Sequence, residues 1–255
     1  MLSIMSPSKT LNFSGRSYSV QTSPFFLSQT RKLASRLKKL STKDLENLMK
    51  ISPKLAVLNH ERFQEFSEDP APGSIGQALL VFKGDVFQGM DTDHYGDDDF
   101  QFAQEHVRIL SGLYGLLRPL DRIQAYRLEM GTRLSGPWGK DLYEFWDDRI
   151  TERLNEELQA SKGAPVLVNL ASNEYAKAVR PQKLRADLIN VQFKEKKGDE
   201  FKIVGIHAKR ARGLMIDFII QNRITEPEPL KEFTRNGYAF HPDLSTPKNW
   251  VFSRG

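Results

Sequence analysis

Two glycines in the apolar segment of residues 110–121 have the spacing of a backbone phosphate site. Gly112 and Gly115 can adopt positive φ and carry no side chain, so the amides around them can come close to an anion. The segment follows an amphipathic stretch that begins near residue 97, and it contains Arg118. The pattern predicts a helix–hairpin–helix-like element, a motif that binds DNA without reading its sequence.

An ordinary corner between two helices would account for the same residues. In that interpretation the glycines only permit the turn, and Leu113, Leu116 and Leu117 fill the core. Pro119 favours it, because the DNA-binding motif normally continues into a longer second helix. The arginines nearby, Arg127 among them, favour the phosphate site.

A second basic segment lies far along the chain, at residues 208–213. Lys209, Arg210 and Arg212 stand at the start of a helix predicted over residues 209–222. Cations there oppose the helix dipole and repel one another, and an anion would relieve both effects. The alternative is a solvated helix start. We expect this segment and the glycine hairpin to converge on one basic cleft.

Small polar and charged residues in several turns are candidates for chemistry. Two of the turns follow apolar strand-like segments, at residues 2–5 and 166–170. A lysine beside other cations can have a lowered pKa and act as nucleophile or base, with Glu174 as its proton-transfer partner. Structural roles, such as turn capping by asparagine or packing by tyrosine, remain open for each residue. The catalytic candidates are Lys9, Lys83, Asp85, Asn169, Asn173, Glu174 and Tyr175.

An acidic run at residues 91–99 is a candidate metal site. Carboxylates and an imidazole suit iron or manganese. The run does not match the calcium-binding EF-hand loop, and capping of the following helix explains its aspartates more simply. We therefore expect no resident metal and no cofactor. The residues concerned are Asp91, Asp93, His94, Asp97, Asp98 and Asp99.

The composition narrows the function classes. The absence of cysteine excludes disulfides, thiolate metal sites and iron–sulfur clusters. The net charge of +5 is modest, but it is uneven, with basic segments at residues 31–43, 108–133 and 194–212 and an acidic one at residues 85–99. The sequence has no apolar run of membrane-spanning length and no signal-peptide pattern at its start, so we expect a cytoplasmic protein without a membrane partner.

The elements that would position these residues alternate along the whole chain. We expect a single α+β domain over residues 1–255, with a central sheet surrounded by helices. Hydrophobic periodicity, caps and turn residues predict the following elements. Strands are expected at residues 2–5 and 166–170, extended chain at 123–130, a hairpin of 188–196 and 201–207, and helices at 24–40, 41–49, 52–66, 97–110, 142–160 and 209–222.

Several of these segments together resemble the bacterial YaaA family. The resemblance rests on residues 6–9, 83–85, 104–131, 169–175, 208–213 and 237–238. It implies a cytoplasmic protein associated with resistance to hydrogen peroxide and with lowering unincorporated iron, and able to bind double-stranded DNA. It also implies a mixed α and β fold around a positively charged cleft, with a helix–hairpin–helix near residues 111–117.

Two hypotheses follow for the function. In the first, the protein grips the backbone of duplex DNA largely independently of sequence, and no protein partner is inferred. In the second, it is an enzyme acting on damaged nucleic acid, a nucleotide or a nucleobase in the same basic cleft. The residues expected to contact DNA are Ser111, Gly112, Tyr114, Gly115, Arg118, Arg127, Lys209, Arg210 and Arg212.

Overall fold

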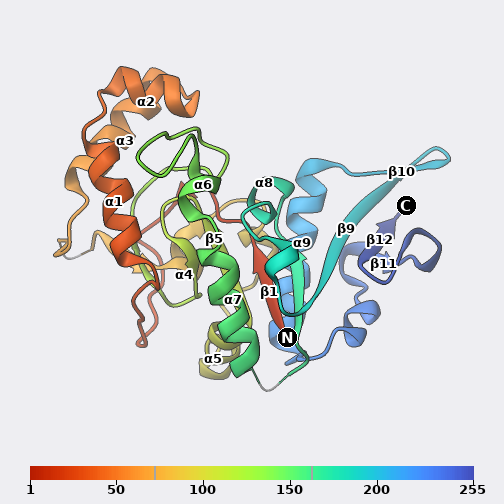
Figure 1. The fold of residues 1–255 in the computed structure, drawn as a ribbon. Helices are drawn as coiled ribbons and strands as arrows, with labels where there is room; N and C mark the ends of the chain where they lie inside the picture. Colours follow the sequence, from red (N-terminus) through yellow and green to blue (C-terminus); the bar gives the residue numbers. More distant parts are fainter. Residues whose placement is uncertain (72, 162) are drawn as a thin grey trace.

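A mixed eight-stranded sheet forms the centre of the computed structural model, which describes residues 1–71, 73–161 and 163–255 (Figure 1). The strand order is β11-β12-β9-β8-β1-β5-β6, with β10 paired to β9. The pairs linking β12, β9, β8, β1 and β5 are parallel, and β6, β10 and β11 are antiparallel to their neighbours. The strands are β1 Leu2–Met5, β5 Val107–Ser111, β6 Gly115–Leu117, β8 Val166–Leu170, β9 Asp187–Lys197, β10 Glu200–Lys202, β11 Ala239–Phe240 and β12 Asn249–Arg254.

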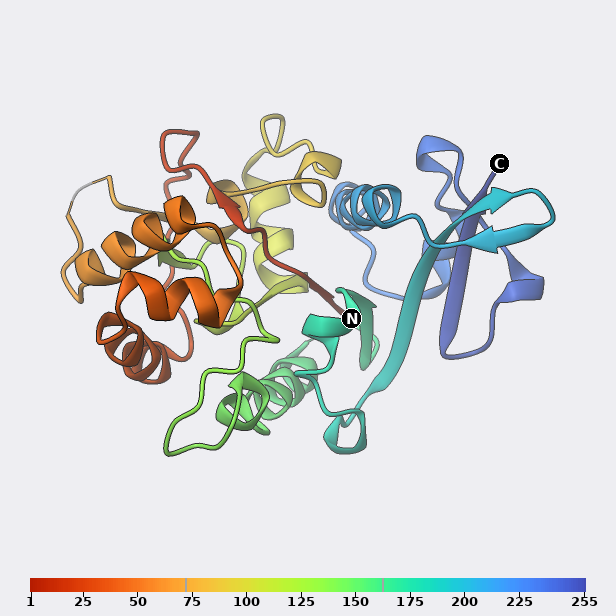
Figure 2. The ribbon, with the colours of Figure 1, turned by 90° about the horizontal axis from the view of Figure 1, so that it is seen from above.

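Helices cover both faces of this sheet. From above, α5 (Asp97–His106) and α9 (Gly205–Gln221) lie on one face, and α7 (Arg149–Ala160) lies on the other (Figure 2). The predicted mixed α and β fold with a central sheet surrounded by helices is therefore confirmed. In the described part of the chain, no helix combines the length and the apolar character needed to cross a bilayer.

Three helices near the N-terminus form a group beside the sheet (Figure 1). They are α1 (Leu27–Lys38), α2 (Thr42–Met49) and α3 (Pro53–Glu65), and all three were predicted. Local signals determine two of their starts. Ser41 forms a capping box with Asp44 at α2, and Ser52 caps α3 ahead of Pro53.

The remaining elements are short. Two small antiparallel ladders, β2 with β4 and β3 with β7, lie outside the main sheet. The short strands and helices are β2 Thr10–Leu11, β3 Ile75–Gln77, β4 Phe82–Lys83, β7 Arg122–Gln124, α4 Ala78–Val81, α6 Leu142–Trp146 and α8 Asn173–Ala176. The 3₁₀ helices are η1 Phe87–Gly89, η2 Pro181–Lys183, η3 Glu228–Glu232, η4 Arg235–Gly237 and η5 Pro242–Leu244.

The predicted helix–hairpin–helix at residues 111–117 is wrong. The helix expected over residues 97–110 ends at His106, and the following residues form β5, which turns back as β6 in an antiparallel β-hairpin. All five residues of β5 are buried, because β5 lies inside the sheet with covered faces. A short apolar run of this kind fits a buried strand as well as a helix, so periodicity alone cannot separate the two.

The two glycines of this hairpin serve packing. A Cβ on Gly112 would lie 2.3 Å from the Leu128 carbonyl oxygen. A Cβ on Gly115, whose φ is +70°, would lie 2.6 Å from the Trp146 ring. Leu113, Leu116 and Leu117 are fully buried. The core-filling role considered for these leucines is therefore confirmed, although the turn joins strands and not helices.

Other boundaries also differ from prediction. The helix expected over residues 142–160 breaks into α6 and α7 around Asp147, which has a φ of 47°. Of the extended chain expected at residues 123–130, only β7 is a strand. The strand at residues 166–170 and the hairpin turn are confirmed, with Gly198 at a φ of +61°. The second hairpin strand, expected over residues 201–207, ends at Lys202, because α9 begins at Gly205.

The packing of Gly115 predicts a large stability effect. We expect Gly115→Ala to lower the free energy of unfolding by about 2 kcal/mol or more, because the new Cβ combines positive φ with a clash against Trp146. Urea unfolding measures it. Gly15→Ala is the control, since no atom lies within 4 Å of its Cβ position. Equal stability of the two variants would contradict the packing role.

Candidate functional site

The carboxyl ends of β1 and β8 bring two polar loops together. The strands are parallel neighbours with Met5 opposite Leu170, so the residues that follow them emerge at the same edge of the sheet. The Ser172 amide donates to Ser6 Oγ at 2.9 Å, and the two serine hydroxyls lie 3.3 Å apart. In β8, Asn169 Oδ1 accepts a hydrogen bond from the Ala171 amide at 2.9 Å.

A second pair of segments joins this edge through the β2–β4 ladder. Thr10 lies opposite Lys83, which places the loop after β1 beside the turn at residues 83–85. Gly84 has a φ of +131°, and a Cβ there would lie 2.7 Å from Ser8 Oγ. Asp85 in turn faces α9, with its carboxylate 4.0 Å from Lys209 Nζ.

Two carboxylates complete the arrangement. Glu129 accepts from both Lys9 Nζ at 2.6 Å and Arg127 Nη2 at 3.2 Å. Glu174 Oε1 accepts the Gly131 amide at 2.8 Å, which ties the segment after β7 to the start of α8. We call this group the strand-end site and define it by Lys9, Lys83, Asp85, Glu129, Asn169, Glu174 and Lys209.

Most of the predicted catalytic candidates therefore lie around one edge of the sheet. Tyr175 differs, because it is buried and burial raises its pKa well above the ordinary value. Its hydroxyl therefore stays protonated, and the residue packs in the core, as the structural alternative held. Asn173 begins α8. The sequence did not single out Glu129, whose pairing with Lys9 spans residues far apart in the chain.

The basic residues of α9 do not lie in its first turn. The helix begins at Gly205 and not at residue 209, so Lys209 and Arg212 lie one turn or more from its N-terminus. The expected conflict with the helix dipole is therefore reduced. Lys209 and Arg210 are exposed, whereas Arg212 is half-buried and burial lowers its pKa.

Four of the residues expected to contact DNA cannot reach it. Ser111, Gly112, Tyr114 and Gly115 are all buried within the hairpin and its packing. Ser111 Oγ lies 2.6 Å from the Tyr126 hydroxyl and accepts the Tyr114 amide, so it has internal partners. The prediction that these residues bind phosphate is wrong, because the hairpin is a core element.

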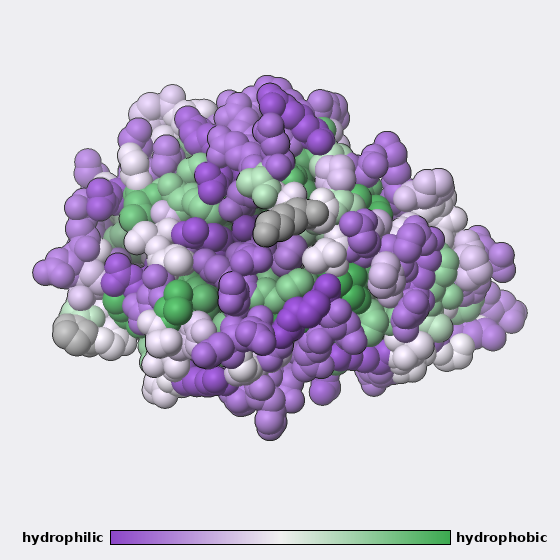
Figure 3. Space-filling view, turned by 90° about the horizontal axis from the view of Figure 1, so that it is seen from below, coloured by the Kyte–Doolittle hydropathy of each residue, from purple (hydrophilic) through white to green (hydrophobic). Residues whose placement is uncertain are grey.

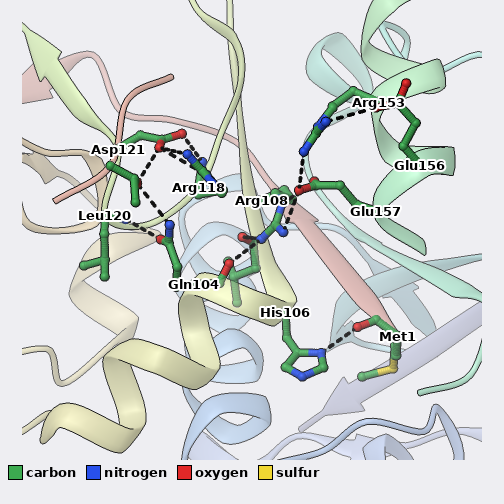
Figure 4. Close-up of polar contacts among 12 residues, drawn as sticks. Met1, Gln104, His106, Arg108, Arg118, Leu120, Asp121, Arg153, Glu156 and Glu157 are labelled. Carbon is green, nitrogen blue, oxygen red and sulfur yellow. Dashed lines mark hydrogen bonds and ion pairs between the residues drawn. The ribbon is translucent and has the colours of Figure 1, made fainter. Parts of the chain in front are cut away.

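Arg118 also lies away from the strand-end site. It follows β6, which runs against the parallel strands, so it emerges toward their amino ends. There it pairs with buried Asp121 at 2.9 Å (Figure 4). Its guanidinium also covers the Phe25 ring. Arg127, another residue expected to contact DNA, does reach the strand-end site, because it pairs with Glu129. The expected convergence therefore involves Arg127 and α9 but not the glycine hairpin.

A cavity of about 790 Å³ lies at the amino ends of the strands, next to Arg118. Its lining includes His106, Arg108 and Glu157, and Arg108 forms a buried two-point ion pair with Glu157 at 2.6 and 3.0 Å (Figure 4). Seen from below, the molecule is mostly hydrophilic with scattered apolar groups (Figure 3). The three arginines that line this cavity, Arg108, Arg118 and Arg153, each pair with a carboxylate of the protein.

The acidic run serves helix capping. Asp99 accepts the Gly96 amide at the start of α5 and pairs with Arg223 at 2.8 Å. His94 lies 2.8 Å from Asp91. The capping role is confirmed for Asp99. Over residues 1–71, 73–161 and 163–255, no three His, Cys, Asp or Glu side chains are arranged to hold a metal ion.

The sheet and the strand-end site together indicate a structural class of protein. A largely parallel sheet flanked by helices, with cationic loops at the carboxyl ends of its strands, is typical of mixed α and β proteins that bind ligands at that edge. The sequence model of the family described as "Peroxide stress protein YaaA" matches residues 1–244. A UPF0246 protein of Acaryochloris marina (strain MBIC 11017) is 53% identical over 254 residues, covering 100% of both chains. The chain therefore belongs to the YaaA family of peroxide stress proteins.

The environment of His106 predicts that the free energy of unfolding depends on pH. Its Nδ1 lies 2.9 Å from the Met1 carbonyl oxygen, and burial lowers its pKa below the ordinary 6.5. As pH falls below about 6.5, the unfolded chain takes up a proton that the native imidazole resists, so stability declines. His106→Asn keeps a hydrogen-bond donor and removes the titration. We expect a smaller loss of unfolding free energy between pH 7.5 and 5.5 in the variant, measured by urea unfolding, and identical losses would contradict this.

Proposed function

We propose that the protein binds double-stranded DNA through its phosphates, largely without reading sequence, in the cytoplasmic response to peroxide stress. The strand-end site and the α2–α3 hairpin supply the contact surfaces. The observation that carries the proposal is an excess of cations around Glu129. Lys9 and Arg127 share this carboxylate. Arg62 of α3 lies near Arg127, and its pKa is lowered mainly by burial and further by the Arg127 charge.

This group of cations needs further negative charge. Among the described residues, Arg62 forms no ion pair, and its guanidinium donates to Asn59 at 3.4 Å. Arg127 Nε is buried without a hydrogen-bond partner. A polyanion neutralises such a group and releases its counterions, which is the main source of affinity in sequence-independent DNA binding.

The α2–α3 hairpin adds a second basic surface. Residues 50–52 join the two helices, and Lys50 has a left-handed conformation at the end of α2. Lys43, Lys50 and Lys54 are exposed on this unit. Two helices joined by a short turn with lysines at its tip suit contact with a phosphate backbone. We infer that these two helices, and not residues 111–117, make the phosphate contacts; the sequence predicted both helices without assigning them a role.

Salt dependence tests the proposal. If about five phosphates are neutralised, log affinity for a short duplex falls against log salt with a slope of roughly −4 to −5. Replacing Lys209 and Arg210 with methionine makes the slope shallower by about 2. We expect a similar change for Lys50→Met with Lys54→Met. Fluorescence anisotropy of a labelled duplex measures each slope.

The matched control removes two exposed lysines elsewhere. Lys196 and Lys197 lie near the β9–β10 turn, far from α2 and α3 (Figure 1). Their replacement with methionine leaves the slope unchanged if binding uses the proposed surfaces. Equal losses in all three double variants would show a diffuse charge effect, and binding insensitive to salt would refute phosphate recognition.

A second candidate function is catalysis on damaged nucleic acid, a nucleotide or a nucleobase. The position of Lys9, Glu129 and Glu174 at the carboxyl ends of parallel strands favours it, because active sites of such sheets form there. Lys9 would act as nucleophile or base and Glu174 as its proton-transfer partner. The lowering of unincorporated iron implied by the resemblance stays a prediction, since no group of metal-ligating side chains among the described residues supports it.

Mass spectrometry separates catalysis from binding. If the site is catalytic, incubation with damaged duplexes or nucleotides yields an altered product, and Lys9→Met lowers its rate by about 100-fold or more. Lys140→Met is the control, because Lys140 pairs with Glu144 at 3.1 Å outside the strand-end site. Unaltered substrates with the unmodified protein would count against catalysis.

A further inference from the structure

Arg212 projects from the buried face of α9. Ala208, Met215 and Ile219 lie four residues before it and three and seven residues after it, and each is at most 2% exposed. This spacing places all four side chains on one helix face. Arg212 is itself half-buried, so a guanidinium lies among apolar neighbours but remains partly accessible.

The Arg212 charge has no partner among the described residues. Its Nε is buried without a hydrogen bond, and none of the ion pairs within residues 1–71, 73–161 and 163–255 includes it. Arg62 is likewise half-buried without an ion pair among the described residues, whereas Arg108 pairs with Glu157 and Arg254 pairs with Glu195. Burying a charge without a counterion is costly, so proteins retain one where a ligand supplies the opposite charge.

The position of Arg212 along the strand direction places it at the strand-end site. The chain just after α9 returns to the start of β1, since a Cβ on Gly163 would contact both Thr225 and Met1. Arg212 lies nine residues before the end of α9, a rise of about 13 Å. The four residues of β1 span about 13 Å as well. Arg212 is therefore level with the end of β1, where the polar loops begin.

Contacts of α9 at the same height agree with this placement. A Cβ on Gly213 would lie 1.8 Å from the Val86 carbonyl oxygen, directly after the turn at residues 83–85. One turn before Arg212, Lys209 lies 4.0 Å from Asp85. Among the described residues Lys83 forms no ion pair, so the cations near Arg212 exceed the carboxylates that face them.

We propose that Arg212 binds a phosphate group of a nucleotide or nucleic acid at the strand-end site, with Lys209 as a second cation. The planar guanidinium can donate two parallel hydrogen bonds to phosphate oxygens. The surrounding lysines favour an anion with more than one charge over a carboxylate. This inference rests on the proposed function and deepens it by naming the group that one half-buried residue recognises.

An unpaired arginine that binds a ligand affects stability differently from an arginine with a structural ion pair. Without ligand, Arg212→Met replaces an unpaired charge by an apolar side chain of similar length, so the variant melts at a higher temperature than the unmodified protein. With phosphate present, the unmodified protein gains stability and the variant does not. Arg185→Met, a change at an exposed arginine just before β9 and away from the strand-end site, serves as the control and retains the gain.

The experiment measures Tm for the three proteins with inorganic phosphate, deoxyadenosine 5′-monophosphate or deoxyadenosine, each at constant ionic strength. We expect both phosphates, but not the nucleoside, to raise Tm, and Arg212→Met to weaken the affinity roughly 10- to 100-fold. A preference for the nucleotide over inorganic phosphate would identify a nucleotide as the source of the group, and equal effects would identify phosphate alone as sufficient. An equal rise in Arg212→Met, or a lower Tm of that variant without ligand, would overturn the inference.

Duplex binding separates this inference from the proposed function. Salt-dependent binding of a duplex with no phosphate effect on Tm would retain the function and reject the Arg212 site. A phosphate effect lost in Arg212→Met, without duplex binding, would retain the site and reject the DNA-binding function.

Discussion

Parallel pairing of β1 with β5 and β8 is the constraint on which the site depends. The register places Met5 opposite both Ile109 and Leu170, so the chain leaves β1 and β8 at the same edge of the sheet. The core residues of these strands are almost fully buried, and a shift of one residue would exchange the side chains that pack against the helices on the two covered faces. The positions of Ser6 and Ser172 therefore follow from packing below the site and not from their own hydrogen bond.

The elements that the sequence predicted well are those with local signals. Ser41 and Ser52 start α2 and α3 through caps formed within three residues, and Gly198 closes the β9–β10 turn by its own conformation. The segment over residues 107–117 lacks such a signal. Its apolar residues fit a helix until the neighbouring strands are known, and the glycines are required by Leu128 and Trp146, which lie far along the chain. The local sequence indicated that glycine is required at these positions, but not that contacts with Leu128 and Trp146 require it.

The candidate site was predictable in part for the same reason. The residue types after β1 and β8 pointed to chemistry, because small polar residues at strand ends are exposed there in parallel sheets. The partners were not predictable. Glu129 meets Lys9 across most of the first half of the chain, and Arg212 differs from Arg210 only through the helix face it occupies once α9 starts at Gly205.

The pairing of charges then separates structural cations from binding ones. At the amino ends of the strands, Arg108 and Arg118 each have a carboxylate within 3 Å, so a ligand there would have to break a pair that the fold already satisfies. At the carboxyl ends, Arg62 and Arg212 have no such partner among the described residues, and Arg127 shares Glu129 with Lys9. These guanidinium groups are partly dehydrated by burial. The attraction between them and an anion is therefore less weakened by water or by competition from a carboxylate of the protein. If the proposed function holds, unequal pairing at the two edges, and not the modest net charge of the chain, determines where the polyanion binds.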